Sequence, residues 1–174
     1  SSMKNKMKKI IYISIEVKSR ELLPKLFFAS RAVNKGFNCF IGDKVAVARA
    51  IKILGAGIYF YKSINHYDTK HIERVKKKHL YVSQDEEAGF AKPNNKEFNK
   101  FITYRSSYEN VKLIDRFYNW GKFDYINYTH RYKREKKKFL ITGSPRLDLW
   151  KKSISDKVFK DQLDQIKKYK KFVL

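Results

Sequence analysis

The sequence predicts an α/β fold in which a Rossmann-like parallel sheet is flanked by helices. Short runs rich in β-branched and aromatic residues alternate with amphipathic stretches, at a spacing of roughly 20 residues. The first of these runs is nearly continuous in apolar character, which is typical of a strand buried on both faces. A hydrophobic content of 43% in 174 residues is enough to build the core of such a domain.

Four predicted strands alternate with three predicted helices in the first half of the chain. The strands are rich in Ile, Val, Phe and Tyr and are expected at residues 10–17, 37–41, 58–61 and 79–83. The helices are expected at residues 20–35, 45–54 and, with a more polar composition, 68–77. Gly36 ends the first helix, and Asp43 is the candidate N-cap of the second.

The second half of the chain is less regular but continues the alternation. A loop is expected at residues 91–95, and two more strands are expected at residues 115–120 and 139–142. Helical segments are expected at residues 97–104, 107–113, 122–129 and 155–169, the last as one basic amphipathic helix.

The chain is strongly basic, with 40 Lys and Arg against 17 Asp and Glu and a formal net charge of +23. Lys supplies 31 of the 40 basic residues, and they form separate clusters at residues 76–78, 131–138 and 151–171. Because Arg is the better fork for bases and phosphates, this excess is a weak signal of nucleic-acid recognition. The charge is either compositional background or an attraction to an anionic partner such as a membrane surface, a nucleotide or nucleic acid.

Several classes of protein and site are excluded by the sequence. One cysteine, Cys39, rules out a disulfide framework and a cysteine-based zinc site. No apolar run reaches the roughly 18 residues of a membrane span, and the start does not have the pattern of a signal peptide. The sequence has neither GxGxxG after the first strand nor GxxxxGK[ST], and its four histidines have no ligand-like spacing, so no cofactor or metal is expected. We expect a cytoplasmic protein with peripheral contact to an anionic inner-membrane face.

Polar side chains follow the predicted strands at the edge where ligands bind in open parallel sheets. The residues just past the strands are therefore the candidate site. They are Glu16, Lys18 and Arg20 after the first strand, Lys62 and Ser63 after the third, Asp85, Glu86 and Glu87 after the fourth, and Gly143, Ser144 and Arg146 after the sixth. The sequence predicts one sheet edge that collects carboxylates, basic residues and glycines.

Each of these groups also has a purely structural interpretation. The acidic run at residues 85–87 is either a solvated loop or the source of a general base or nucleophile. The turn after the sixth strand either starts a helix, with Ser144 as N-cap and Pro145 first, or presents backbone N–H groups and Arg146 to an anion. The aromatic stretches at residues 117–120 and 123–128 either pack in the core or stack on bases or sugars.

Five blocks of the sequence, taken in order, resemble the bacterial surface carbohydrate biosynthesis proteins. They are IEVKSRELLPKLFFASRAVNKGFNCFIGDK, GIYFYKS, DEEAGF, FYNWGKFD and ITGSPRLDLW, within a resemblance that spans about residues 10–174. Proteins of this family are similar to glycosyltransferases with two Rossmann domains (the GT-B type). They are more distantly similar to retaining β-Kdo transferases and polyglycerol-phosphate transferases. Ala88 stands where a glycine is expected directly after the acids, so the register of the acids stays open.

The resemblance implies that this chain is the N-terminal, acceptor-side half of a GT-B-type two-domain enzyme. The G-x-P-R-x-D block at residues 143–148 resembles the element that ends the N-terminal domain of such enzymes. On this basis residues 1–9 are a tag remnant and basic arm, and residues 10–152 are the Rossmann-like domain. Residues 153–174 would then be a linker helix and the truncated first strand of an absent C-terminal domain, ending in KFVL.

The resemblance also implies an activity in the biosynthesis of lipopolysaccharide, capsule or another surface polysaccharide. A sugar would pass from a nucleotide-activated donor, held mainly by the absent domain, to a glycan or glycolipid acceptor on this half. A carboxylate of Asp85, Glu86 or Glu87 would act as general base or nucleophile, while Lys18, Arg20 and Arg146 would neutralise phosphate or carboxylate groups. This half alone is expected to be inactive.

Two other functions are compatible with the sequence. A nucleic-acid-binding α/β module would account for the net charge of +23 and the aromatic content of 16%, although no RNP-like or helix-turn-helix pattern is present. A scaffold or regulator of polysaccharide assembly would keep the fold without the reaction.

Overall fold

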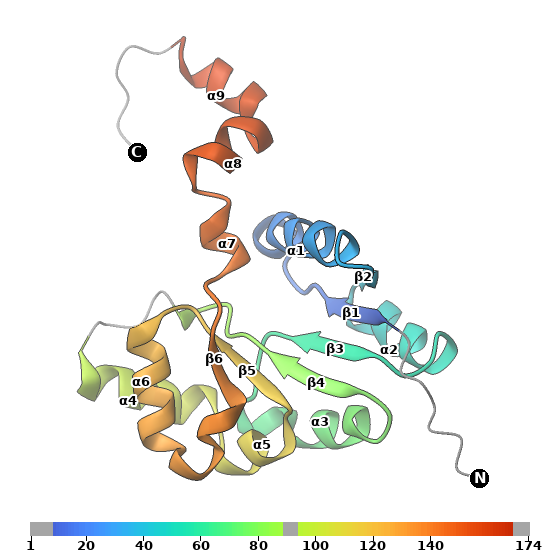
Figure 1. Ribbon diagram of the computed structural model, residues 1–174, viewed down its shortest axis with the longest axis vertical. Helices are drawn as coiled ribbons and strands as arrows, with labels where there is room; N and C mark the ends of the chain where they lie inside the picture. Colours follow the sequence, from blue (N-terminus) through green and yellow to red (C-terminus); the bar gives the residue numbers. More distant parts are fainter. Residues whose placement is uncertain (1–8, 89–93, 169–174) are drawn as a thin grey trace.

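The computed structural model describes residues 9–88 and 94–168. Its centre is a six-stranded sheet in which every pair of neighbouring strands is parallel, in the order β2-β1-β3-β4-β5-β6 (Figure 1). The strands are β1 Ile10–Ser14, β2 Asn38–Gly42, β3 Ile58–Tyr61, β4 Leu80–Ser83, β5 Arg116–Asn119 and β6 Phe139–Ile141. The predicted Rossmann-like α/β class is confirmed.

Helices connect the strands in the alternation that the sequence predicts. The α-helices are α1 Lys18–Val33, α2 Lys44–Ile53, α3 Thr69–Lys76, α4 Asn95–Arg105, α5 Tyr108–Leu113, α6 Lys122–Arg131, α7 Pro145–Asp148, α8 Lys152–Val158 and α9 Lys160–Ile166. Short 3-10 helices occupy η1 His66–Asp68 and η3 Lys133–Lys138. Asp43 caps α2 as predicted, because its side chain accepts a hydrogen bond from the Ala46 N–H at 2.7 Å.

The two faces of the sheet are covered unequally. One face packs against α2, α3, α4, α5 and α6 and contains the larger core cluster, which includes Val47, Ile72, Phe98, Val111 and Tyr128. The other face packs against Ala29 and Ala32 of α1 in a smaller cluster. Because strands of a parallel sheet normally have both faces covered, the side with fewer helices has more apolar surface left to bury.

A row of tyrosines crosses the centre of the sheet. Tyr12, Tyr59 and Tyr81 are register neighbours on β1, β3 and β4, and each is at most 1% exposed. The Tyr12 hydroxyl donates to the Gly55 carbonyl at 2.6 Å, and the Tyr81 hydroxyl donates to the Ser63 carbonyl at 3.1 Å. These partners allow phenolic groups to occupy the core, and burial raises the pKa of all three tyrosines.

The first strand is shorter than the sequence predicts, and the first helix begins earlier. β1 ends at Ser14 rather than at residue 17, and α1 begins at Lys18 rather than at Arg20. The reason lies in Glu21, whose carboxylate accepts the Glu16 N–H at 2.9 Å and so draws the chain away from the sheet. Lys18 and Arg20 therefore lie in the first turn of α1 and not in a loop.

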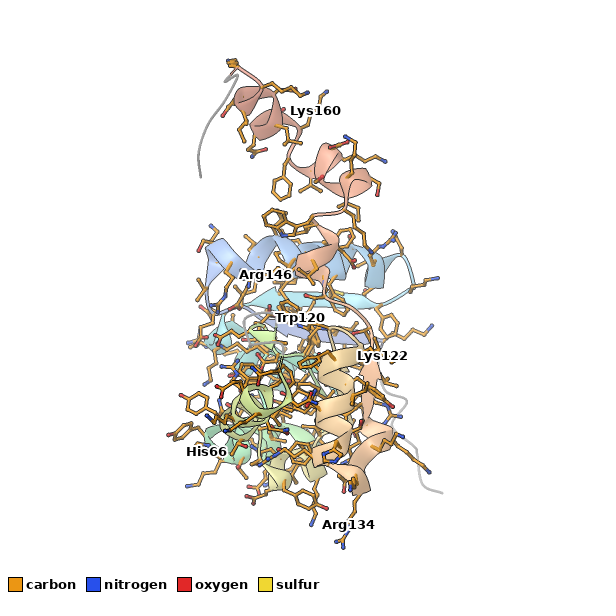
Figure 2. All side chains as sticks on the ribbon, turned by 90° about the vertical axis from the view of Figure 1, so that its left-hand side faces the viewer. His66, Trp120, Lys122, Arg134, Arg146 and Lys160 are labelled. Atoms are coloured by element: carbon orange, nitrogen blue, oxygen red, sulfur yellow. The ribbon has the colours of Figure 1, made fainter. Side chains whose placement is uncertain are left out.

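The prediction of a single helix at residues 155–169 is wrong. Two short helices, α8 and α9, occupy the described residues of this range, and Phe159 interrupts the helical path between them with φ −111° and ψ 24°. The break places Phe159 and Leu163 opposite Leu23 of α1, with which they line a groove of about 580 Å³. α8 and α9 extend beyond α1, with Lys160 and Arg134 at opposite ends of the molecule (Figures 1 and 2). The predicted terminal strand lies outside the described residues.

Candidate functional site at the carboxyl edge of the sheet

The order of the strands places a crevice at the end of the sheet where ligands usually bind. β1 lies between β2 and β3, so the chain crosses from β1 to β2 in one direction along the sheet and from β2 to β3 in the other. This reversal is a switch point, and a crevice opens there at the carboxyl ends of the strands. The structure has a cavity of about 260 Å³ there, lined among others by Ser14 of β1, Tyr61 of β3 and Asp43 after β2. The predicted edge is therefore hollowed at the position that the topology favours.

Glu16 and Lys62 form an ion pair across this crevice. Glu16 follows β1 and Lys62 follows β3, and both line the 260 Å³ cavity. Burial lowers the pKa of Lys62, and the nearby Arg105 guanidinium lowers it further. Ser63, the next residue, is buried and accepts hydrogen bonds from the backbone N–H and the side-chain amide of Asn65. Ser63 therefore shapes a turn and, in contrast to the prediction, does not face the crevice.

Asp85 is buried beneath a bidentate contact from Arg105. The guanidinium donates from Nε to Oδ2 at 2.9 Å and from Nη2 to Oδ1 at 2.8 Å. The carboxyl group is 3% exposed, and burial raises its pKa while the hydrogen bonds from Arg105 act in the opposite direction. Since both oxygens are engaged, Asp85 holds the loop after β4 and is not poised as a base.

Glu86 is also engaged in the interior. Its carboxylate pairs with Lys25 of α1, and the two side chains are 9% and 4% exposed. The Lys25 ammonium lies 4.5 Å from the centre of the Phe60 ring on β3. This pair connects α1 to the end of β4. Glu86 therefore has a structural role that does not depend on catalysis.

Glu87 is the member of the acidic run that faces solvent. Its side chain is 43% exposed, and its Oε2 accepts from Arg105 Nη1 at 3.1 Å. Its backbone N–H donates to Asp85 Oδ1 at 2.8 Å, which closes the turn. Arg105 thus holds two carboxylates of one loop, and Glu87 is the one whose second oxygen has room to meet a ligand.

The first turn of α1 brings further charge to the same edge. Arg20 donates to Glu21 at 2.8 Å, and this hydrogen bond raises the pKa of Arg20, with smaller contributions from the charges of Glu21, Glu87 and Glu86 and an opposing effect of burial. Lys18, two residues before Arg20 in the same turn, is exposed. The edge therefore gathers five carboxylates (Glu16, Glu21, Asp85, Glu86, Glu87) and four paired cations (Arg20, Lys25, Lys62, Arg105).

The turn after β6 follows the structural interpretation in part. Gly143 has φ +77°, a left-handed conformation that favours glycine, and its carbonyl accepts from the Gln84 amide at 2.6 Å. Ser144 occupies the N-cap position with Pro145 first in α7, but its buried hydroxyl makes no capping hydrogen bond. Arg146 is half-buried and lines the groove between α1 and α9 together with Arg20. α7 is a single turn, so it offers no extended row of backbone N–H donors to an anion.

Sequence reasoning missed the cations that hold the acids. Lys25 lies in the apolar stripe of α1, four residues after Glu21, and Arg105 is the last residue of α4. A charged residue within an otherwise apolar stripe is a signal of a buried pair, because its burial requires a partner. Arg105 gave no such signal, since basic residues at helix ends are common.

The aromatic stretches at residues 117–120 and 123–128 belong to the core in part, whereas Tyr118 is only partly buried and Phe123 is 38% exposed. Phe117 and Tyr128 are at most 1% exposed, and their ring centres lie 4.7 Å apart. Trp120 donates from its indole N–H to the Asp85 carbonyl at 2.8 Å, which fixes the β5 loop against the acidic loop. These rings support the site from below and leave its surface to charged groups.

Two surveys of the part of the chain that the structure describes gave negative results. Within residues 9–88 and 94–168, no group of three or more His, Cys, Asp or Glu side chains has the arrangement of a metal site. Over the same residues, no helix combines the length and apolarity needed to cross a membrane.

Comparisons with known proteins do not assign the chain to a family. No family model, no curated protein and no solved structure matches it.

Proposed function

We propose that this chain is the acceptor-binding half of a glycosyltransferase of the two-Rossmann-domain type, acting in bacterial surface polysaccharide biosynthesis. The observation that carries the proposal is the position of Glu87. It is a half-exposed carboxylate that follows β4 and is held by Arg105 at 3.1 Å. It does not line the switch-point crevice itself, but its charge acts on the pKa of Lys62, which does line it. A carboxylate that is fixed by one oxygen and open at the other suits a general base.

In this proposal Glu87 removes the proton from an acceptor hydroxyl as that oxygen attacks the anomeric carbon of the donor sugar. The new carbon–oxygen bond forms while the bond to the nucleotide phosphate breaks, and the phosphate leaves with the electron pair. In the retaining alternative the carboxylate first attacks the anomeric carbon and displaces the nucleotide phosphate. The acceptor hydroxyl then displaces the carboxylate, which takes up the hydroxyl proton as it is released. Asp85 and Glu86 act as positioning residues, because their oxygens are committed to Arg105 and Lys25.

The other ligand contacts follow from the charges around Glu87. Lys18 and Arg20 lie in the first turn of α1, and Arg146 lies in α7 across the groove from Arg20. Their positive charges would neutralise phosphate or carboxylate groups of the acceptor or donor. We place the nucleotide of the donor on a second domain, since the sequence lacks the glycine-rich loops that cradle phosphates. Exposed lysines would add peripheral contact with an anionic membrane.

Sugar transfer by the protein encoded by the full gene tests this proposal. Release of nucleotide from a panel of nucleotide sugars, with membrane glycolipids as acceptors, would be compared between wild type and Glu87→Gln. Loss of a general base is expected to lower turnover by about 10²- to 10⁴-fold. Glu73→Gln, an exposed site on α3, is the matched control and is expected to keep the wild-type rate.

Two results would contradict the proposal. Wild-type turnover in Glu87→Gln would remove this residue from the mechanism. Sugar transfer by residues 1–174 alone would contradict the division of donor and acceptor between two domains. A folded Glu87→Gln variant, checked by circular dichroism, is needed for the first comparison.

A further inference from the structure

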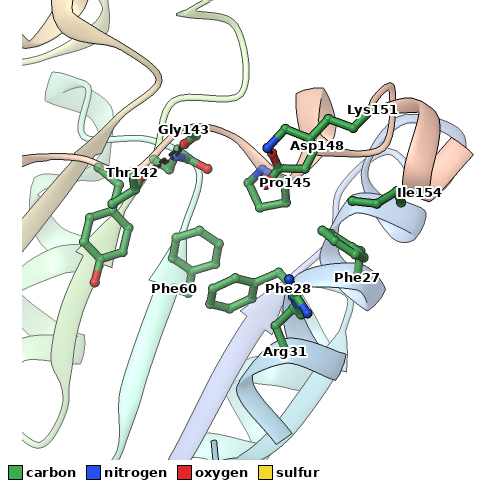
Figure 3. Close-up of a pocket in the computed structure, with 12 residues that line it drawn as sticks. Phe27, Phe28, Arg31, Phe60, Thr142, Gly143, Pro145, Asp148, Lys151 and Ile154 are labelled. Atoms are coloured by element: carbon green, nitrogen blue, oxygen red, sulfur yellow. Dashed lines mark hydrogen bonds and ion pairs between the residues drawn. The ribbon is translucent and has the colours of Figure 1, made fainter. Parts of the chain in front are cut away.

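A second cavity lies on the α1 side of the sheet, apart from the acidic edge. Its volume is about 420 Å³, within the range of roughly 300–1,000 Å³ that is typical of small-molecule sites. Asp85, Glu86 and Glu87 do not line it, and of the site residues that the sequence predicts it contains Gly143 alone. Figure 3 shows α1 on one side of this cavity and the segment from Thr142 to Ile154 on the other.

The cavity exists because this face of the sheet is only partly covered. α1 packs over β1, β2 and β3, whereas the helices that contact β5 and β6 lie on the opposite face. Leu140 on β6 is consequently 42% exposed, and Tyr118 on β5 is partly buried at the margin of the α1 cluster. The space that a further helix would fill is left as a hollow above the strands.

Aromatic rings form one wall of the cavity. Phe28 of α1 stacks on Phe60 of β3 with ring centres 4.9 Å apart and an angle of 25°, and Tyr118 lies 6.3 Å from Phe60. Such a wall gives a flat apolar surface on which a ligand ring can lie. In Figure 3, Phe28 and Phe60 lie between α1 and the strands, facing the segment that contains Gly143 and Pro145.

Polar groups form the opposite wall. The Gln84 amide is 5% exposed and donates to the Gly143 carbonyl at 2.6 Å and to the Thr142 hydroxyl at 3.3 Å. Asp148 adds a carboxylate from α7. This wall offers hydroxyl, amide and carboxylate groups within one cavity. Such mixed donors and acceptors suit a ring that carries several hydroxyl groups along its rim.

The mouth of the cavity is positively charged. Lys151 pairs with Asp148 at 2.6 Å, which leaves the charge of Arg31 in excess among the lining residues. Arg31 is exposed on α1, with its guanidinium 5.8 Å from the centre of the Phe27 ring. A ligand with one negative group at its edge would therefore complement the rim.

We propose that this cavity binds a single pyranose ring that carries a negatively charged substituent. One apolar face of the sugar lies on Phe28 and Tyr118, which the buried ring of Phe60 supports from behind. The hydroxyls of the sugar meet the polar wall, and its charged group meets Arg31. The choice of a sugar over another ring of this size rests on the proposed function as well as on the polar wall. The negative group is a carboxylate or a phosphate, because the same guanidinium recognises either.

Calorimetric titration of the whole chain without any donor tests the proposal. The probes are methyl glucoside, glucuronic acid and glucose 6-phosphate, with uridine monophosphate as a nucleobase probe. Dissociation constants of about 1 mM are expected for the two anionic sugars, as is normal for one ring, and about tenfold weaker binding for the neutral sugar. Arg31→Gln is expected to remove this tenfold preference, whereas Arg134→Gln, an exposed arginine of η3 at the other end of the sheet, is expected to keep it.

A blocking variant ties the binding to this cavity. Thr142→Trp places an indole at the cavity and is expected to abolish binding, whereas Thr103→Trp, on the exposed surface of α4, is expected to leave it unchanged. Equal affinity of both tryptophan variants, equal affinity for neutral and charged sugars, or tighter binding of uridine monophosphate would each overturn the proposal. Binding without sugar transfer by the full-length protein would instead contradict the proposed function and leave this site standing.

Discussion

At the scale of single residues, three neighbouring acids acquire different roles through their partners. Asp85 is enclosed by Arg105, Glu86 pairs with Lys25 in the interior, and Glu87 keeps one side open to solvent. Nothing in the run of three carboxylates predicts this division, because the cations come from α1 and α4, distant in the sequence. The residue types predict that carboxylates are available at this edge. Tertiary contacts determine which of the three carboxylates stays open to solvent.

The buried pair of Lys25 and Glu86 leads to a prediction about stability. Lys25→Met removes one partner and leaves an uncompensated carboxylate in the interior, so we expect a loss of about 3 kcal/mol in the free energy of unfolding. The double variant Lys25→Met with Glu86→Leu replaces both charges by apolar groups and is expected to return to within about 1 kcal/mol of wild type. Urea unfolding of the single and double variants measures both. A double variant as unstable as Lys25→Met would show that the pair contributes more than mutual compensation.

His71 leads to a prediction about pH. Arg74 donates to its Nδ1 at 3.2 Å, so the ring is neutral and its Nε2 proton points to the Tyr59 hydroxyl at 3.1 Å. Burial, and then the charges of Arg74 and Lys44, lower its pKa from 6.5 to about 4, against a smaller opposing effect of Asp68. Between these values the unfolded chain binds the proton and the folded chain does not, so stability falls as the pH falls through this window.

The expected loss from His71 is on the order of 2 kcal/mol between pH 7 and pH 4, after allowance for the partial exposure of the ring. His71→Phe keeps a ring at this position and removes its titration, so its stability should depend less on pH by that amount. Urea unfolding at both pH values compares the two proteins. The same pH dependence in wild type and variant would show that His71 is not the group responsible.

At the scale of elements, the turn between α2 and β3 requires a glycine. A Cβ at Gly57 would lie 2.6 Å from the Ile10 carbonyl oxygen and 2.5 Å from the Ile10 Cγ2, both part of the central strand β1. Gly57→Ala must therefore displace backbone, and we expect a loss of about 2–3 kcal/mol in the free energy of unfolding. Gly121→Ala is the matched control, because its nearest contact would be an ordinary 3.8 Å to the Asp124 carboxylate. Equal midpoints of thermal unfolding in the two variants would contradict this account.

The elements differ in how far the sequence predicts them. All six strands and the helices from α1 to α6 were predicted in type and order, because each has an apolar pattern of its own and is bounded by Gly, Asp or Asn. The segment of α8 and α9 is predicted as one helix, since its apolar residues fit a continuous helical pattern, and the structure interrupts it at Phe159. Local pattern therefore predicts the sheet and the helices that cover it, while contacts between distant segments determine the pairing at the site.

At the scale of the whole molecule, charge is divided between the two edges of the sheet. The acids that the structure describes near Glu87 gather at the carboxyl edge. Exposed lysines precede β4 at residues 77–78 and precede β6 in η3, so they lie at the amino edge. Because all strands are parallel, these edges are opposite ends of one sheet. Among the described residues, the exposed lysines at residues 77–78 and in η3 therefore lie opposite the paired charges of the carboxyl edge, an arrangement that composition alone does not reveal.

This arrangement predicts how the molecule meets an anionic membrane. The triple variant Lys133→Gln, Lys136→Gln and Lys137→Gln neutralises the amino edge at η3, where all three side chains are exposed. At about 1 kcal/mol per lysine, partitioning onto vesicles of phosphatidylserine and phosphatidylcholine should fall by about a hundredfold.

The triple variant Lys152→Gln, Lys157→Gln and Lys160→Gln makes the same change in net charge on α8 and α9. If the amino edge faces the lipid, this control loses less than tenfold, and the carboxyl edge with Glu87 stays open to substrate. If both triples lose affinity equally, the attraction comes from net charge alone and the molecule has no preferred orientation on the surface.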